Sequence, residues 1–160
     1  KITEEYRKDY LGNVSHELKT PLFTVQGYIL TLLDGAMNAK DDRKKYLERA
    51  AKGVDRLIYI IKDLVKRGAK IQAFDPKAME EAQHFYLKDT PNVKYTSNKY
   101  EALENAHAMI LLTEWKTFRA PDFDAIKTAL QDPIVFDGRN QYSDIEMQKR
   151  GFEYYQIGKK

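Results

Sequence analysis

The chain has 160 residues, which is enough for one ordinary domain or two small ones. Hydrophobic residues make up 42% and charged residues 32%, a composition that excludes a disordered or membrane-embedded chain. The net charge of +3 at pH 7 does not by itself indicate a nucleic-acid or membrane partner. There is no cysteine, so disulfides and thiolate sites are excluded, and we expect a reducing, cytoplasmic location. Because the chain begins at Lys1 rather than at methionine, we expect it to be a fragment.

Residues 1–66 have the apolar spacing of two amphipathic helices. The first stripe consists of Val14, Leu18, Leu22, Val25, Ile29 and Leu32. The second stripe consists of Tyr46, Ala50, Val54, Leu57, Ile61 and Leu64. Asp34-Gly35 ends the first helix and Asp41-Asp42 begins the second, which makes an antiparallel hairpin. One hairpin buries both stripes poorly, so we expect a homodimer that forms a four-helix bundle.

The segment SHELKTPL, from Ser15 to Leu22, places a proline inside the first predicted helix. Pro21 removes a backbone N–H and clashes with the carbonyl of Glu17, at a cost of about 3 kcal/mol or more. One turn earlier, His16 is adjacent to the apolar stripe without belonging to it, so we expect it to face solvent. An ordinary surface histidine is the alternative interpretation.

His16, Glu17, Thr20 and Pro21 on such a hairpin resemble the phosphorylation motif of sensor histidine kinases, over about residues 6–64. A neutral imidazole is a nucleophile near pH 7, which suits a phosphoacceptor role for His16. Glu17 suits a general base that holds the imidazole tautomer. The resemblance implies that Thr20 places water for dephosphorylating a response regulator, and that Pro21 lets the helix bend between signalling states.

The resemblance also implies partners that this chain does not contain. They are a response regulator receiver domain and an ATP-binding kinase domain, acting in trans with ATP and Mg²⁺. Nothing from Gly68 onward resembles such a kinase domain. We therefore expect this chain to bind no cofactor itself.

Residues 67–160 alternate short apolar runs with helical patterns, which predicts a Rossmann-like parallel sheet with flanking helices. Expected strands are 70–74, 93–96, 108–112, 133–136 and 152–157, with 108–112 buried on both faces. Expected helices are 77–87, 99–106, 122–130 and 143–150. The fold class is therefore α + α/β: a helical hairpin followed by a truncated parallel sheet.

Three loops follow the carboxyl ends of predicted strands, where such sheets bind ligands. They are Asp75-Pro76, Thr113-Glu114-Trp115 and Asp137-Gly138-Arg139-Asn140. The Arg139 guanidinium can clamp a phosphate, or it can cap a carbonyl or pair with a neighbour. Trp115 is either a packing residue or a stacking platform.

The segments AFDPKAM, ILLTEWKTF and IVFDGRN, in this order, resemble the C-terminal domain of the UDP-glucose/GDP-mannose dehydrogenases. The resemblance implies a UDP-sugar ligand, with Arg139 and Asn140 as substrate-binding residues. The NAD-binding domain and catalytic cysteine of that family do not occur in the sequence. The family's first strand is also missing, so the other strands close up, a second chain fills the gap, or this half is loose.

The stretch Ile58–Leu64 suits both resemblances, because each family has an amphipathic helix there. The chain is therefore interpreted as a chimera, and a joined gene in a single DNA read would exclude an artefact. Three functions remain open: a phosphoacceptor that uses His16, a UDP-sugar-binding remnant that uses Arg139, and an interaction module without activity. We favour the phosphoacceptor, because its whole domain is present.

Overall fold

The structure, a computed structural model, describes residues 4–35, 38 and 40–156; before residue 20 it describes the side chain of residue 17 only. Its contacts divide the chain into two compact units, residues 1–64 and residues 65–160. The sequence places the boundary two residues later, after residue 66. The first unit is helical, and the second combines parallel strands with short helices, which is the expected α + α/β organisation.

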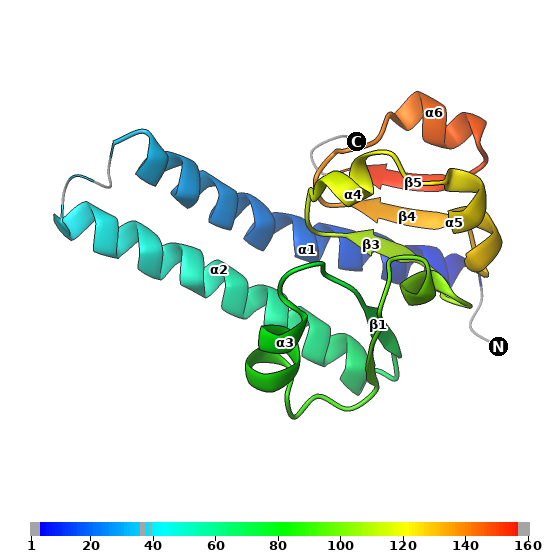
Figure 1. Cartoon of the computed structure of the whole chain (residues 1–160), viewed down its shortest axis with the longest axis horizontal. Coiled ribbons are helices and arrows are strands. Elements are labelled where there is room, and N and C mark those ends of the chain that lie inside the picture. Colours follow the sequence, from blue (N-terminus) through cyan, green and yellow to red (C-terminus); the bar gives the residue numbers. More distant parts are fainter. Residues whose placement is uncertain (1–3, 36–37, 39, 157–160) are drawn as a thin grey trace. The chain divides into compact units, whose positions relative to one another are not determined.

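The first unit is a pair of long helices, α1 (Glu4–Leu33) and α2 (Lys40–Lys66), which lie side by side and run antiparallel (Figure 1). After α1 the chain turns at Gly35, whose φ of 122° carries no steric penalty in glycine. α2 begins with Asp41 and Asp42, whose carboxylates interact favourably with the N-terminal end of the helix dipole. The predicted hairpin is confirmed. Within the part of the chain that is described, no helix is both long and apolar enough to cross a membrane.

The seam between α1 and α2 follows the predicted stripes only in part. Pro21 and Gly53 are buried, although neither belongs to a stripe. The rings of Tyr28 and Tyr46 meet across the seam with centroids 5.8 Å apart, whereas Ile29 is exposed. On α1 the contact with α2 therefore runs through Pro21 and Tyr28. The predicted apolar stripe contains the residues that follow them, Leu22 and Ile29, so the seam is displaced by one residue.

Large apolar side chains of both helices remain exposed in the single chain. They are Phe23, Ile29, Leu30, Leu33, Leu47, Val54 and Tyr59. Two of them, Ile29 and Val54, belong to the predicted stripes. One hairpin thus leaves part of each stripe exposed to water, as expected from the sequence.

Five short strands, all paired in parallel, form two sheets in the second unit. The smaller sheet pairs β1 (Ile71–Ala73) with β2 (Val93–Tyr95). The larger sheet has the order β3 (Met109–Leu111), β4 (Ile134–Asp137) and β5 (Glu153–Gln156). The predicted parallel direction is confirmed. Among the described residues the strands do not close up into one sheet, which excludes one of the three outcomes expected for a missing strand.

β4 is the centre of the larger sheet, and all four of its residues are buried. Val135 lies opposite Met109 on β3 and Tyr154 on β5. The expectation that β3 is buried on both faces is wrong, because Ile110 is 38% exposed at the edge of the sheet. The core cluster consists of Leu111, Phe118, Ile126, Leu130, Val135, Tyr142, Met147 and Phe152.

Short helices connect the strands. They are α3 (Met79–Glu81), the π-helical turn η2 (Ala82–Tyr86), the 3₁₀ turn η3 (Glu101–Leu103), α4 (Lys116–Arg119), α5 (Phe123–Ala129) and α6 (Asp144–Lys149). The predicted helices 122–130 and 143–150 are present as α5 and α6. The predicted helix 99–106 is wrong beyond η3, because Asn105 takes the left-handed conformation with φ of 58° and ends the turn. α4 was not predicted.

Candidate functional site

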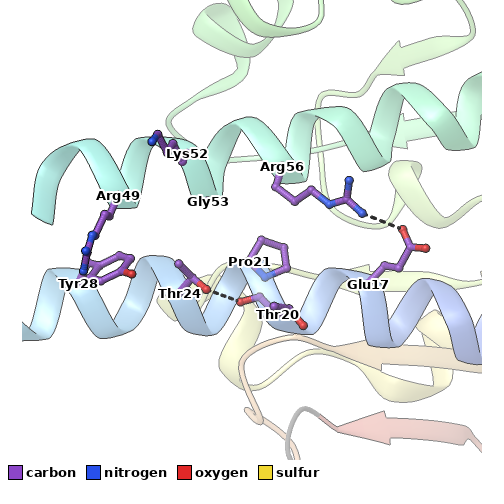
Figure 2. Close-up of a pocket in the computed structure, with 9 residues that line it drawn as sticks. All are labelled: Glu17, Thr20, Pro21, Thr24, Tyr28, Arg49, Lys52, Gly53 and Arg56. Carbon is purple, nitrogen blue, oxygen red and sulfur yellow. Dashed lines mark hydrogen bonds and ion pairs between the residues drawn. The ribbon is translucent and has the colours of Figure 1, made fainter. Parts of the chain in front are cut away.

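A groove of about 480 Å³ lies between α1 and α2 of the first unit (Figure 2). α1 contributes a carboxylate, two hydroxyls, a proline and a tyrosine, and α2 contributes three basic side chains and a glycine. The lining residues are Glu17, Thr20, Pro21, Thr24, Tyr28, Arg49, Lys52, Gly53 and Arg56. The structure thus brings three sequence-predicted residues, Glu17, Thr20 and Pro21, to one groove. The side chain of His16 lies outside the described side chains, although its backbone belongs to α1.

Gly53 lets the two helices approach closely at Pro21. A Cβ atom on Gly53 would lie 2.5 Å from Val25 Cγ2 and 3.3 Å from the Pro21 carbonyl oxygen. Figure 2 shows the Pro21 ring pointing from α1 toward α2. The Thr24 hydroxyl donates to the Thr20 carbonyl oxygen at 2.9 Å, a type of bond that favours helix bending. The proline that disturbs α1 therefore lies where α2 approaches closely, and α1 continues through it.

Glu17 faces α2 rather than solvent alone. Its Oε2 lies 3.7 Å from an Nη atom of Arg56, and both side chains are about half exposed. Such a pair contributes only about 0.2–1 kcal/mol to stability. Its consequence is positional, because it holds the carboxylate on the groove side of α1. The side chain of His16 lies outside the described side chains, so contact between Glu17 and the imidazole stays a prediction.

Arg49, Lys52 and Arg56 form a row on α2 at intervals of three and four residues, which places them on one face of the helix. The Arg49 guanidinium lies 5.6 Å from the centroid of the Tyr28 ring, and Figure 2 shows it reaching across to α1. Sequence reasoning missed this basic row. Its signal is the spacing of charges along α2, on the side next to the apolar stripe.

The second candidate site lies at the carboxyl ends of the strands of the second unit, where three predicted loops meet. The Trp115 indole Nε1 donates to Asp75 Oδ2 at 3.0 Å, which joins the loops after β3 and β1. Arg139 Nη2 lies 2.9 Å from Glu114 Oε1, which joins the loops after β4 and β3. Asp75 also accepts backbone hydrogen bonds, from Lys77 and from the residue after it. The polar side chains of these three loops are thus linked by a hydrogen bond and an ion pair.

Asp137 organises the loop that carries Arg139. It is 1% exposed, and its carboxylate accepts hydrogen bonds from the backbone N–H groups of Arg139, Gln141 and Tyr142, at 2.7–3.1 Å. The Tyr154 hydroxyl donates to the same carboxylate at 2.6 Å. Burial, followed by this hydrogen bond, raises the pKa of Tyr154 above its usual value. Asp137 belongs to a loop predicted from the sequence, but this role of its carboxylate was not predicted.

Arg139 is already engaged in this structure. Its side chain is 19% exposed, one end bonds Glu114, and its Nε is buried without a hydrogen-bond partner among the described residues. The pairing with a neighbour, left open by the sequence, is therefore what the geometry shows. Asn140, next in the loop, is exposed and takes the left-handed conformation with φ of 52°. In the described portion of the chain, no cluster of three or more His, Asp or Glu residues is arranged to hold a metal ion.

Comparisons with protein families match each unit separately. Residues 56–144 match the UDP-glucose/GDP-mannose dehydrogenase family, UDP binding domain. Residues 6–68 match the His Kinase A (phospho-acceptor) domain. The two matches overlap over residues 56–68, which contains the stretch that the sequence assigns to both families.

Curated relatives are UDP-glucose 6-dehydrogenases. That of Rhizobium meliloti (strain 1021) is 36% identical over 102 residues, covering 64% of this chain and 22% of the relative. That of Rickettsia bellii is 33% identical over 137 residues, covering 82% and 31%. TuaD of Bacillus subtilis (strain 168) is 31% identical over 147 residues, covering 92% and 30%, so this similarity extends into both units. The chain spans between a fifth and a third of the length of these relatives.

Proposed function

The chain belongs to the UDP-glucose/GDP-mannose dehydrogenase family through its UDP binding domain, and we propose that it functions as a phosphoacceptor hairpin joined to that domain. The observation that carries the proposal is the phospho-acceptor match over residues 6–68, on a hairpin in which Glu17, Thr20 and Pro21 line one groove. A phospho-acceptor domain implies, in general, dimerization and partnership with a kinase domain and a response regulator.

His16 is the proposed acceptor. A neutral imidazole nitrogen attacks the γ-phosphorus of ATP held by a kinase domain in trans; the N–P bond forms and the bond to the ADP oxygen breaks. Glu17 receives the imidazole proton in this scheme, and its ion pair with Arg56 supports a fixed position for the carboxylate. The phosphoryl group then passes to a receiver domain. In the opposite reaction, Thr20 places the water molecule that dephosphorylates the response regulator.

A second copy of the hairpin is the proposed dimer partner. Exposed apolar residues on both helices support this, since Leu30, Leu33 and Leu47 are each more than half exposed in one chain. Pairing two hairpins would remove such surface from water, at roughly 25 cal/mol per Å² of apolar area. Sedimentation of the full chain tests this step, and a monomer at micromolar concentration would contradict it.

Phosphoramidate, a small phosphoryl donor, tests His16 without a cognate kinase. Mass spectrometry should find the phosphoryl group on His16, and His16→Gln should abolish it. The double variant His84→Gln, His107→Gln removes the other two histidines and is the control that should keep the label. A label that stays after His16→Gln would refute the assignment. A histidine-kinase ATP-binding domain with ATP and Mg²⁺ then tests transfer in trans.

UDP-sugar binding by the second unit is the alternative function, favoured by the convergence of three loops around Arg139. A charge-assisted hydrogen bond from Arg139 to a phosphate contributes about 1.5–3 kcal/mol, so Arg139→Ala should weaken UDP binding at least tenfold. Arg150→Ala is the matched control. Arg150 directly follows α6 and pairs with Glu146 of that helix, not with the loops around Arg139. Isothermal titration with UDP measures both variants, and equal affinities would argue against this site.

A chimeric origin remains part of the proposal. The overlap of the two family matches over residues 56–68 supports a junction there. The similarity to TuaD, which extends into both units, leaves a longer dehydrogenase-like segment as the competing explanation. A single DNA read across the codons for residues 56–68 distinguishes a joined gene from two separate parent genes.

A further inference from the structure

The segment 112–115 connects β3 with α4 at the carboxyl ends of the strands, the side to which the arrows of β3 and β4 point in Figure 1. The segment has no regular secondary structure, but both of its ends are fixed. Leu111, the last residue of β3, is buried, and its carbonyl accepts a hydrogen bond from Gly138 N–H at 2.8 Å. Phe118 in α4 is also buried, and its carbonyl accepts the Tyr142 hydroxyl at 2.7 Å. The segment is therefore a short bridge between two fixed points.

Two adjacent side chains tie this bridge to the loops of both sheets. Glu114 Oε1 lies 2.9 Å from Arg139 Nη2, in the loop after β4 of the larger sheet. The indole N–H of Trp115 donates to Asp75 Oδ2 at 3.0 Å, in the loop after β1 of the smaller sheet. Because Glu114 and Trp115 are consecutive, a backbone movement that withdraws one of them also disturbs the contact of the other.

Glu114 occupies Arg139 in the way that an anionic ligand would. The Arg139 backbone is fixed, since its N–H donates to Asp137 Oδ1 at 2.8 Å. The Glu114 side chain is 59% exposed and is free to move toward water, whereas that of Arg139 is 19% exposed. A guanidinium carries several N–H donors, and the ion pair joins one nitrogen to one carboxylate oxygen. A phosphate offers more acceptor oxygens and can bind the guanidinium bidentately, so it can displace the carboxylate.

We propose that residues 112–115 form a gate that keeps anionic ligands from Arg139 until Glu114 withdraws, and that the hydrogen bond from Trp115 to Asp75 holds this gate closed. The proposal rests on the proposed UDP-sugar site and describes its regulation. A ligand that needs Arg139 binds only the fraction of molecules whose gate is open, so weakening either contact should raise the apparent affinity. The coupling is reciprocal, so a phosphate bound at Arg139 should weaken the bond between Trp115 and Asp75.

Asp75→Asn breaks the contact with the gate while it keeps the turn that Asp75 organises. Asp75 Oδ1 accepts the backbone N–H groups of Lys77 and Ala78, and the asparagine carbonyl oxygen can accept both. The asparagine NH₂ group then stands where Oδ2 accepted the indole N–H of Trp115, and two donors cannot bond each other. Asp122→Asn is the matched control, because Asp122 loses the same charge and its Oδ1 accepts two backbone N–H groups at the start of α5.

Isothermal titration of the full chain with UDP measures the effect on affinity. Asp75→Asn should lower the dissociation constant about two- to fivefold, because one hydrogen bond of the closed gate is lost. Asp122→Asn should leave it unchanged. In a Glu114→Gln background the gate no longer competes for Arg139, so Asp75→Asn should add little further affinity. Unchanged or weaker binding in Asp75→Asn, or full additivity of the two substitutions, would overturn the gate.

The indole N–H of Trp115 tests the coupling without any ligand. Its exchange with water, measured by NMR, should be several-fold faster in Glu114→Gln than in the unsubstituted chain. Glu146→Gln is the control, because it removes a comparable ion pair, that with Arg150, outside the gate. Equal indole exchange in Glu114→Gln and Glu146→Gln contradicts the coupling whether or not UDP binds. If UDP binds to none of the variants, the UDP-sugar site is wrong, and indole exchange then decides by itself whether the two contacts open together.

Discussion

Adding one methyl group at Gly53 tests whether the close approach at Pro21 determines the stability of the hairpin. In an exposed helix position, Gly→Ala stabilises by about 1 kcal/mol because alanine loses less backbone entropy. At Gly53 the new Cβ would lie 2.5 Å from Val25 Cγ2, a separation that demands movement. Val25 is β-branched and has one strongly preferred rotamer in a helix, so its methyl group does not swing away freely. The Pro21 carbonyl oxygen, at 3.3 Å, limits the other direction.

Overpacking of this kind costs about 1–3 kcal/mol, which cancels or exceeds the gain in helix propensity. Gly27 provides the matched control, since it lies in α1 and a Cβ there meets nothing within 4 Å. The propensity gain is common to both substitutions, so Gly53→Ala should be less stable than Gly27→Ala by about 1–3 kcal/mol.

Urea unfolding followed by far-ultraviolet circular dichroism measures the difference, because α1 and α2 dominate the helical signal. The double variant Gly53→Ala, Val25→Ala removes the clashing methyl and should recover part of the loss. Equal stabilisation by Gly53→Ala and Gly27→Ala would refute a close approach of α1 to α2 at Gly53.

Three further predictions concern the second unit. Glu114→Gln should tighten UDP binding in isothermal titration, because it releases Arg139 from its ion pair; unchanged affinity would show that the pair does not compete. Asp137→Ala should destabilise the second unit by at least about 3 kcal/mol in urea unfolding, because several buried donors lose their acceptor at about 1–3 kcal/mol each; a loss below 1 kcal/mol would contradict this role. Burial raises the pKa of Tyr142 to about 12, above the value near 10 in the unfolded chain. The free energy of unfolding should therefore be unchanged below pH 10 and fall as the pH rises to 12. Urea unfolding at each pH should show a smaller fall in Tyr142→Phe, and an equal fall in both proteins would contradict the prediction.

The hairpin could be predicted from sequence because apolar spacing, the Asp34-Gly35 stop and the acidic start of α2 all indicate the same hairpin. The line of contact could not be placed to one residue. Spacings of three and four fit two adjacent positions, and Pro21 and Gly53 carry no apolar signal although their small size decides where the helices touch.

In the second unit, too, one part of the site could be predicted from the sequence and another could not. The rule that ligand loops follow the carboxyl ends of parallel strands predicts that the loops of Asp75, Glu114 and Arg139 lie together, and their contacts in the structure agree. The role of Asp137 was not visible, because a carboxylate at the end of a strand looks like one more loop residue. Its burial depends on backbone N–H groups that turn back toward it, and the order of residues does not reveal that turn.

Trp115 gives the protein an optical probe at an informative place. It is the one tryptophan in the sequence, it is 40% exposed, and its indole N–H is tied to Asp75 at the loops around Arg139. Selective excitation of the indole therefore reports on the second unit alone, while circular dichroism reports mainly on α1 and α2. A single sample carries separate signals for its two halves, so their unfolding and ligand responses are separable without labels or truncation.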